Sequence, residues 1–174
     1  MPPVTLPDHL ADAGFEVSGI DAFTAERVVA FVDSILQDDC CKDAHRELER
    51  SVGKFFDDFS PDRRFFLALK REGALCAFTA IDRYKDDTAT LKWIFVSRDC
   101  RGQGIGSWLL DEALAFAHGV GYEKAILCTA TNMEAAHLLY KSRGFVFKQW
   151  VTFWRQRMQV FENVFGESVA ELAE

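Results

Sequence analysis

Three strand-like segments follow one another in the middle of the chain and restrict its fold more than any other feature. They are Arg64–Lys70, Ala74–Tyr84 and Thr88–Val96, and only three residues separate each from the next. Connections this short join antiparallel neighbours, because parallel strands need a crossover of roughly a dozen residues or more. The segments therefore predict an antiparallel three-stranded meander.

A strand–helix–strand pattern follows, in which the last strand of the meander is the first strand. Apolar residues recur at helical spacing over Ile105–His118, and Gly119 and Gly121 follow where such a helix would end. The next apolar run, Lys124–Thr129, has the length of a strand. Two strands joined through a helix pair in parallel. We therefore expect Lys124–Thr129 to lie beside Thr88–Val96 in a mixed sheet.

The segment before the meander predicts one strand and two helices. The strand is expected at Phe15–Ile20. Apolar side chains then recur at helical spacing from Thr24 to Leu36 and again over Ala44–Phe59, with charged residues on the remaining faces.

The last third of the chain predicts one more helix and a final strand pair. Thr131 and Glu134 have the spacing of a capping box, and Gly144 fits the C′ position of the helix that they would begin. Phe145–Trp154 and Gln156–Phe165 read as strands. The order of elements predicts the α+β class, also described as an α/β mixed sheet, with six to seven strands and about four helices over both faces.

The length of 174 residues favours a single domain over residues 1–174. Three of the four prolines fall in the first seven residues, so we expect a flexible leader over about residues 1–13. No Lys or Arg follows Arg157, and we expect residues 166–174 to form an acidic tail.

The net charge of −7 is concentrated at the two ends of the chain, because no Lys or Arg precedes Arg27 or follows Arg157. This distribution argues against nonspecific binding to nucleic acid or to an anionic membrane surface. The longest run without a charged residue, Ala113–Tyr122, is far shorter than the roughly 18 residues of a membrane span.

Five cysteines without a C-x-x-C motif read as reduced thiols of a cytoplasmic protein. Cys76 and Cys128 lie in apolar strand-like runs, where we expect them to pack as small hydrophobic residues. The four histidines are scattered, and no metal site is expected.

The segment Arg101–Ser107 places three alternating glycines before a helix. The first N–H groups of a helix lack partners within it, and the helix dipole adds partial positive charge there. Glycines let a phosphate group approach the backbone closely. A P-loop would need Lys and Ser or Thr where Ser107 and Trp108 stand, and the dinucleotide fingerprint would need a third glycine at Ser107. Both nucleotide interpretations therefore fit poorly.

The pattern Arg101-x-x-Gly104-x-Gly106 resembles the acyl-CoA pyrophosphate loop of the GNAT N-acetyltransferase superfamily. The segment from Ala135 through Leu139 and Tyr140 to Phe145 resembles the second signature of that family. The order of elements is similar as well, so the resemblance covers about residues 15–165.

The resemblance implies that acetyl-CoA lies between the strands Thr88–Val96 and Lys124–Thr129, which splay apart in this family. Asn132 stands one position earlier than the asparagine of many members, and it is equally well explained as a turn residue. The cofactor-binding residues that the resemblance implies are Ile94, Phe95, Val96, Arg101, Gly102, Gln103, Gly104, Ile105, Gly106, Ser107 and Asn132.

The resemblance also assigns Tyr140 as the general acid that protonates the leaving thiolate, although a tyrosine on an apolar helix is more often a core residue. Thr90 stands where many members carry a glutamate base. The base is therefore open: Asp82, a chain of waters, or an acceptor that arrives deprotonated.

The function implied is an N-acetyltransferase that moves an acetyl group from acetyl-CoA to a primary amine, of a small molecule, by direct attack in a ternary complex without a metal. The alternative is a non-catalytic module that binds or senses acyl-CoA. The acceptor region would include Glu47, Arg50, Phe55, Trp150 and Trp154. The aromatic residues of the last two strands suggest a two-fold homodimer.

Overall fold

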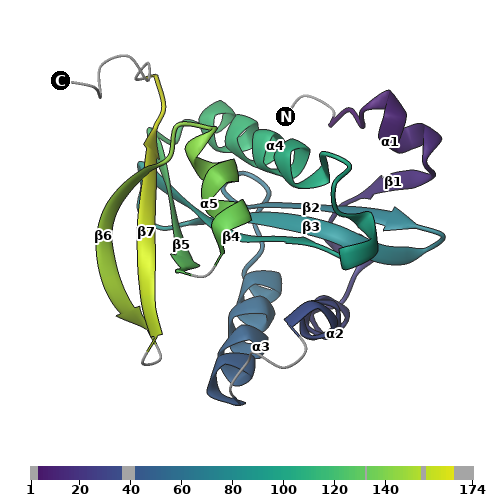
Figure 1. The fold of residues 1–174 in the computed structure, drawn as a ribbon, viewed down its shortest axis with the longest axis horizontal. Coiled ribbons are helices and arrows are strands. Elements are labelled where there is room, and N and C mark those ends of the chain that lie inside the picture. The colour runs from purple at the N-terminus through teal and green to yellow at the C-terminus, as the bar shows by residue number, and fades with distance from the viewer. Residues whose placement is uncertain (1–3, 37–41, 132, 154–155, 167–174) are drawn as a thin grey trace.

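A seven-stranded sheet with helices on both faces forms the body of the computed structural model, which describes residues 4–36, 42–131, 133–153 and 156–166 (Figure 1). The strand order across the sheet is β1-β2-β3-β4-β5-β7-β6. The strands are β1 (Phe15–Ser18), β2 (Phe65–Arg71), β3 (Ala74–Arg83), β4 (Thr88–Val96), β5 (Lys124–Ala130), β6 (Val146–Phe153) and β7 (Gln156–Val164). The α-helices are α1 (Asp8–Asp12), α2 (Ala25–Leu36), α3 (Lys42–Asp57), α4 (Ile105–Gly119) and α5 (Glu134–Lys141), and two 3-10 helices are η1 (Ile20–Ala22) and η2 (Arg98–Cys100).

The pairing of the strands confirms both the meander and the parallel pair. β2, β3 and β4 pair antiparallel in sequence order, and β4 pairs in parallel with β5. β7 lies between β5 and β6 and is antiparallel to both. The sheet is therefore mixed, and the α+β class predicted from the sequence is confirmed, with five α-helices where about four were expected.

Two buried clusters hold the helices on opposite faces of the sheet. On one face Ile105, Leu109 and Ala113 of α4 pack against side chains of the central strands. On the other face α2 and α3 cover an aromatic cluster in which Phe78 is fully buried, 5.5 Å from Phe66 between ring centroids. Figure 1 shows α4 and α2–α3 on the two sides of β3 and β4. β4 is therefore fixed from both faces.

The N-terminal segment differs from the flexible leader that the sequence predicts. Asp8–Asp12 forms α1, and Leu10 is fully buried in the cluster on the α4 side. Nε2 of His9 lies 3.2 Å from the Gln103 carbonyl oxygen, so α1 also contacts the glycine segment. One buried leucine in a five-residue helix is too short a pattern for hydrophobic periodicity to detect. The expected acidic tail lies outside the described residues, apart from Gly166.

Helix α5 ends as predicted but begins differently. It starts at Glu134 and has no side-chain cap, so the capping box assigned to Thr131 is wrong. At its end Gly144 has a φ of 81°, and the Phe145 N–H bonds to the Tyr140 carbonyl at 3.2 Å. A glycine in the left-handed conformation, together with this backbone bond from residue 145 to residue 140, is the Schellman arrangement.

The cysteines follow the expectation only in part. Cys76 and Cys100 are buried, and burial together with the neighbouring Cys100 thiol raises the pKa of Cys76 to about 11. Cys128 is exposed on β5, which contradicts the buried position expected for it. Cys40 and Cys41 lie outside the described residues.

Candidate active site

The sheet opens between β4 and β5. The two strands pair only over Thr88–Thr90 and Lys124–Ile126. β4 remains paired with β3 as far as Val96, and β5 remains paired with β7 as far as Ala130. Beyond Thr90 and Ile126, each strand therefore has one edge without a partner strand in the described sheet. Such an edge presents backbone donors and acceptors to which an extended ligand can bind.

A β-bulge lies where the two strands part. Ala80 and Ile81 are consecutive on β3, but their partners on β4 are Trp93 and Leu91, so Lys92 is the extra residue. A bulge bends its strand and increases the local twist. The bulge therefore helps to turn the end of β4 away from β5.

The chain runs from β4 through η2 and the glycine segment into the N-terminus of α4. Gly104 is the N-cap residue, no side chain caps the helix, and its first turn contains no acid. The first backbone bond of the helix joins the Trp108 N–H to the Gly104 carbonyl at 3.0 Å. The N–H groups of Ile105, Gly106 and Ser107 therefore lack partners within α4. These donors, together with the helix dipole, attract an anion.

The three glycines differ in backbone conformation and in surroundings. Gly102 and Gly104 have φ angles of 76° and 79°, a backbone conformation in which a side chain is strained. A Cβ at Gly104 would contact nothing within 4 Å, so the space beside the N-cap is open. A Cβ at Gly106 would instead lie 3.7 Å from Leu139 and 4.0 Å from Val96. Both are ordinary van der Waals distances, so Gly106 marks where α4 meets β4 and α5, and the packing there has room for a Cβ.

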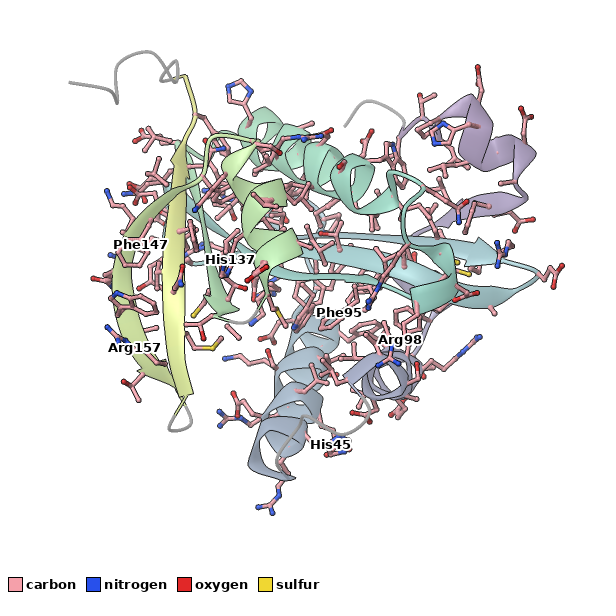
Figure 2. All side chains as sticks on the ribbon, viewed as in Figure 1. His45, Phe95, Arg98, His137, Phe147 and Arg157 are labelled. Carbon is pink, nitrogen blue, oxygen red and sulfur yellow. The ribbon has the colours of Figure 1, made fainter. Side chains whose placement is uncertain are left out.

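The structure brings most of the predicted cofactor-binding residues together at the end of β4 and the start of α4. Ile94 and Val96 pack against the cluster on the α4 side, whereas Phe95 packs on the opposite face (Figure 2). Nε of Arg101 donates to the Val96 carbonyl at 3.1 Å, so this backbone acceptor is already bonded within the protein. Asn132 lies outside the described residues.

Tyr140 lies on α5, which directly follows β5 in the chain. Its ring packs against the α4-side cluster and meets Phe145 edge to face, 5.9 Å between centroids. Burial raises the pKa of Tyr140 to about 12. Within the described part of the chain, its hydroxyl has no hydrogen-bond partner. The phenol is therefore protonated at neutral pH and can donate to a ligand.

Thr90 occupies the last paired position of β4, opposite Asp82 on β3. The Asp82 carboxylate accepts hydrogen bonds from Nε of Arg64 at 2.6 Å and from the Arg83 N–H at 2.8 Å. To act as a base, Asp82 would have to give up part of this ion pair. Among the described residues, no three His, Cys, Asp or Glu side chains are grouped as metal ligands.

Sequence reasoning missed Lys92. Its Nζ lies 5.3 Å from the ring centroid of Trp93, on the face that carries α3. The sequence signal was a lysine inside the otherwise apolar run from Leu91 to Val96. Its orientation could not be read from alternation, because the bulge shifts the pattern by one residue.

The comparisons with known proteins agree on one family. The family model for the acetyltransferase (GNAT) family matches residues 28–145, which is more than half of the chain. The putative phosphinothricin acetyltransferase YwnH of Bacillus subtilis (strain 168) is 25% identical over 104 residues, which cover 58% of this chain and 63% of that protein. The chain thus spans less than two thirds of this relative.

Two solved structures share the fold. An acetyltransferase from Streptococcus agalactiae 2603 has a TM-score of 0.73 at 16% identity, covering 87% of this chain and 99% of that one. The PaiA N-acetyltransferase from Thermoplasma acidophilum, in complex with coenzyme A, has a TM-score of 0.64 at 13% identity, with coverage of 87% and 99%. The family match includes the strands on both sides of the opening and the whole glycine segment, and the chain therefore belongs to the GNAT acetyltransferase family.

Proposed function

We propose that this protein transfers an acetyl group from acetyl-CoA to a primary amine of a small molecule, by direct attack within a ternary complex. The observation that carries the proposal is the continuous path from the free edge of β4 to the uncapped N-terminus of α4. An extended arm with amide groups suits a strand edge, and a pyrophosphate suits a helix N-terminus. A CoA ester carries both groups in this order.

The amides of Gln103–Ser107 are the proposed pyrophosphate ligands, and the backbone of Ile94–Val96 is the proposed partner of the pantetheine arm. Coenzyme A in the PaiA structure, which has the same fold, supports this ligand. Binding to the Val96 carbonyl would require Arg101 to release it. Arg101 would then be free to meet the ligand's phosphates, which adds a charged partner to the neutral backbone donors.

The proposed chemical step forms a bond from the amine nitrogen to the thioester carbonyl carbon and breaks the carbon–sulfur bond. The nitrogen loses one proton to water, and water returns one proton to the departed sulfur, so the products are an amide and a thiol. The sulfur leaves as a thiolate, beside which we place Tyr140. A thiol has an ordinary pKa of about 8.5, so complete proton transfer from a phenol with a pKa of about 12 is uphill. We therefore propose that Tyr140 acts mainly by donating a hydrogen bond to the departing sulfur.

Two further expectations from the sequence stay proposals. Phe147 and Trp150 are exposed on β6, which supports a two-fold dimer through this hairpin, on which Figure 2 labels Phe147. A cytoplasmic location is the second. Among the described helices, none has the length and apolar character of a membrane span.

The first prediction concerns the reaction. Acetyl-CoA at about a hundredfold excess over its Kd should stabilise the protein by about 2.7 kcal/mol, and NAD and ATP should not. With a panel of primary amines, at least one amine should accelerate thiol release above the rate of acetyl-CoA hydrolysis. Binding without acceleration by any amine would instead identify an acyl-CoA-binding module.

The second prediction concerns a substitution that should weaken acetyl-CoA binding without lowering the stability of the protein. Ser107→Asp adds an acid to the first turn of α4, where the helix dipole stabilises negative charge by about 0.3–1 kcal/mol. We expect unchanged or increased thermal stability, with acetyl-CoA affinity reduced by roughly tenfold or more through repulsion of the pyrophosphate. Ser107→Asn, the uncharged control, should bind nearly as well as the wild type. Equal affinity in the Asp and Asn variants would place the phosphates elsewhere.

The third prediction concerns Tyr140. Tyr140→Phe keeps the ring packing and removes the donor, so acetyl-CoA affinity and stability should persist. A hydrogen bond to a charged group contributes about 1.5–3 kcal/mol, so kcat should fall roughly 10- to 150-fold. Because the pKa is about 12, loss of the Tyr140 proton should not lower the wild-type rate until the pH approaches that value. The control is Tyr84→Phe, at an exposed tyrosine in the turn after β3. Equal turnover in both variants would return Tyr140 to a packing role.

A further inference from the structure

Lys92 lies at the point where the opening begins. It is the bulged residue of β4, two positions after Thr90, the last residue that pairs with β5. The adjacent β4 residue Leu91 faces the cluster on the α4 side, whereas Trp93 faces the cluster beneath α3. The Lys92 side chain lies on the same side of the sheet as Trp93, because its Nζ lies over that ring. Its ammonium group therefore lies on the α3 side of the sheet, the side opposite α4.

The ammonium group of Lys92 is half-buried and has no carboxylate within 4.0 Å in the part of the chain that the structure describes. The acids that act on it electrostatically are Asp82 and Glu47. Each already has a closer cation: Asp82 pairs with Arg64 at 2.6 Å, and Glu47 pairs with Arg50 at 2.7 Å.

The other charged groups that act on Lys92 are cations. Burial is the main cause that lowers the pKa of the Lys92 ammonium group, and Lys54 of α3 and Arg64 lower that pKa further. Among the described residues, the two carboxylates that act on Lys92 are thus those already paired with Arg64 and Arg50. A partly buried charge without a partner is costly, and a bound anion would remove much of that cost.

We propose that Lys92 binds an anionic group, such as a carboxylate, on the amine acceptor. This inference rests on the proposed acetyltransferase function and names its substrate class: small amines that carry a negative charge. The Trp93 ring offers an apolar surface beside the ammonium group for the carbon skeleton of such a molecule. The role is one of substrate recognition, and the amine itself would be directed toward the free edge of β4.

The test compares each acceptor with its uncharged counterpart. Amino acids of several side-chain sizes, with the amine at the α, β or γ position, are paired with the carboxamides of the same molecules, and kcat/KM is measured with saturating acetyl-CoA. The amine of the carboxamide is the less basic, so chemistry alone favours the amide. We expect the wild type to prefer the carboxylate by at least about tenfold, the scale of a partly buried charge pair.

Three variants assign that preference to Lys92. Lys92→Met keeps an unbranched apolar side chain and should abolish the preference, mainly by raising KM for the carboxylate, while acetyl-CoA affinity and activity with the amides persist. Lys92→Arg should retain most of the preference. The matched control is Lys85→Met, because Lys85 also lies over the ring of an adjacent aromatic residue, Tyr84, at 5.4 Å, but in an exposed turn. It should behave as the wild type.

The possible outcomes bear separately on the role of Lys92 and on the acetyltransferase function. Equal kcat/KM for carboxylates and amides in the wild type, or an undiminished preference in Lys92→Met, would overturn the role of Lys92 and leave the acetyltransferase function standing. The wild-type comparison holds even if Lys92→Met does not fold. Acetyl-CoA binding without acetylation of any amine in either set would overturn this inference, and the proposed function would fall with it only if no primary amine of the wider panel were acetylated either.

Discussion

The loss of backbone pairing between β4 and β5 after Thr90 and Ile126 is the constraint on which the candidate site depends. A strand edge inside a sheet is normally covered, because unpaired N–H and C=O groups are costly when water is excluded. Here each strand keeps its other partner, so the sheet remains continuous through β3 and β7. Arg101 bonds one carbonyl of the free β4 edge. The opening is thus a stable part of the fold and does not require a loop to be displaced.

The position of α4 makes the two ends of the opening chemically different. Its first turn follows the free edge after residues 97–104, and Gly106 lies where that turn meets Val96 and Leu139. Neutral backbone donors therefore lie at one end of the opening, and the bulge with Lys92 lies at the other. A long ligand that is anionic at one end and reactive at the other fits this polarity. The side on which we propose that the acceptor binds contains a partly buried cation at Lys92 and a hydroxyl at Thr90.

The sequence predicted the sheet well because its strands have strong local signals. The three-residue connections around Ala74–Tyr84 leave few alternatives, and the strand–helix–strand unit fixes the parallel pair. The short helix α1 was missed, since one buried residue, Leu10, gives no periodicity. The start of α5 was misplaced because a turn and a capping box share residue types at Thr131. The bulge at Lys92 is a property of the register with β3, which a single strand does not encode.

The proposed site requires that one ligand spans the free edge of β4 and the N-terminus of α4. Amide hydrogen exchange with and without acetyl-CoA tests this requirement, because a ligand that bonds to backbone N–H groups slows their exchange. We expect slower exchange in two separate segments, Ile94–Val96 and Gln103–Ser107, at the same ligand concentration. Slower exchange in only one of them, or in neither while acetyl-CoA stabilises the protein, would contradict it.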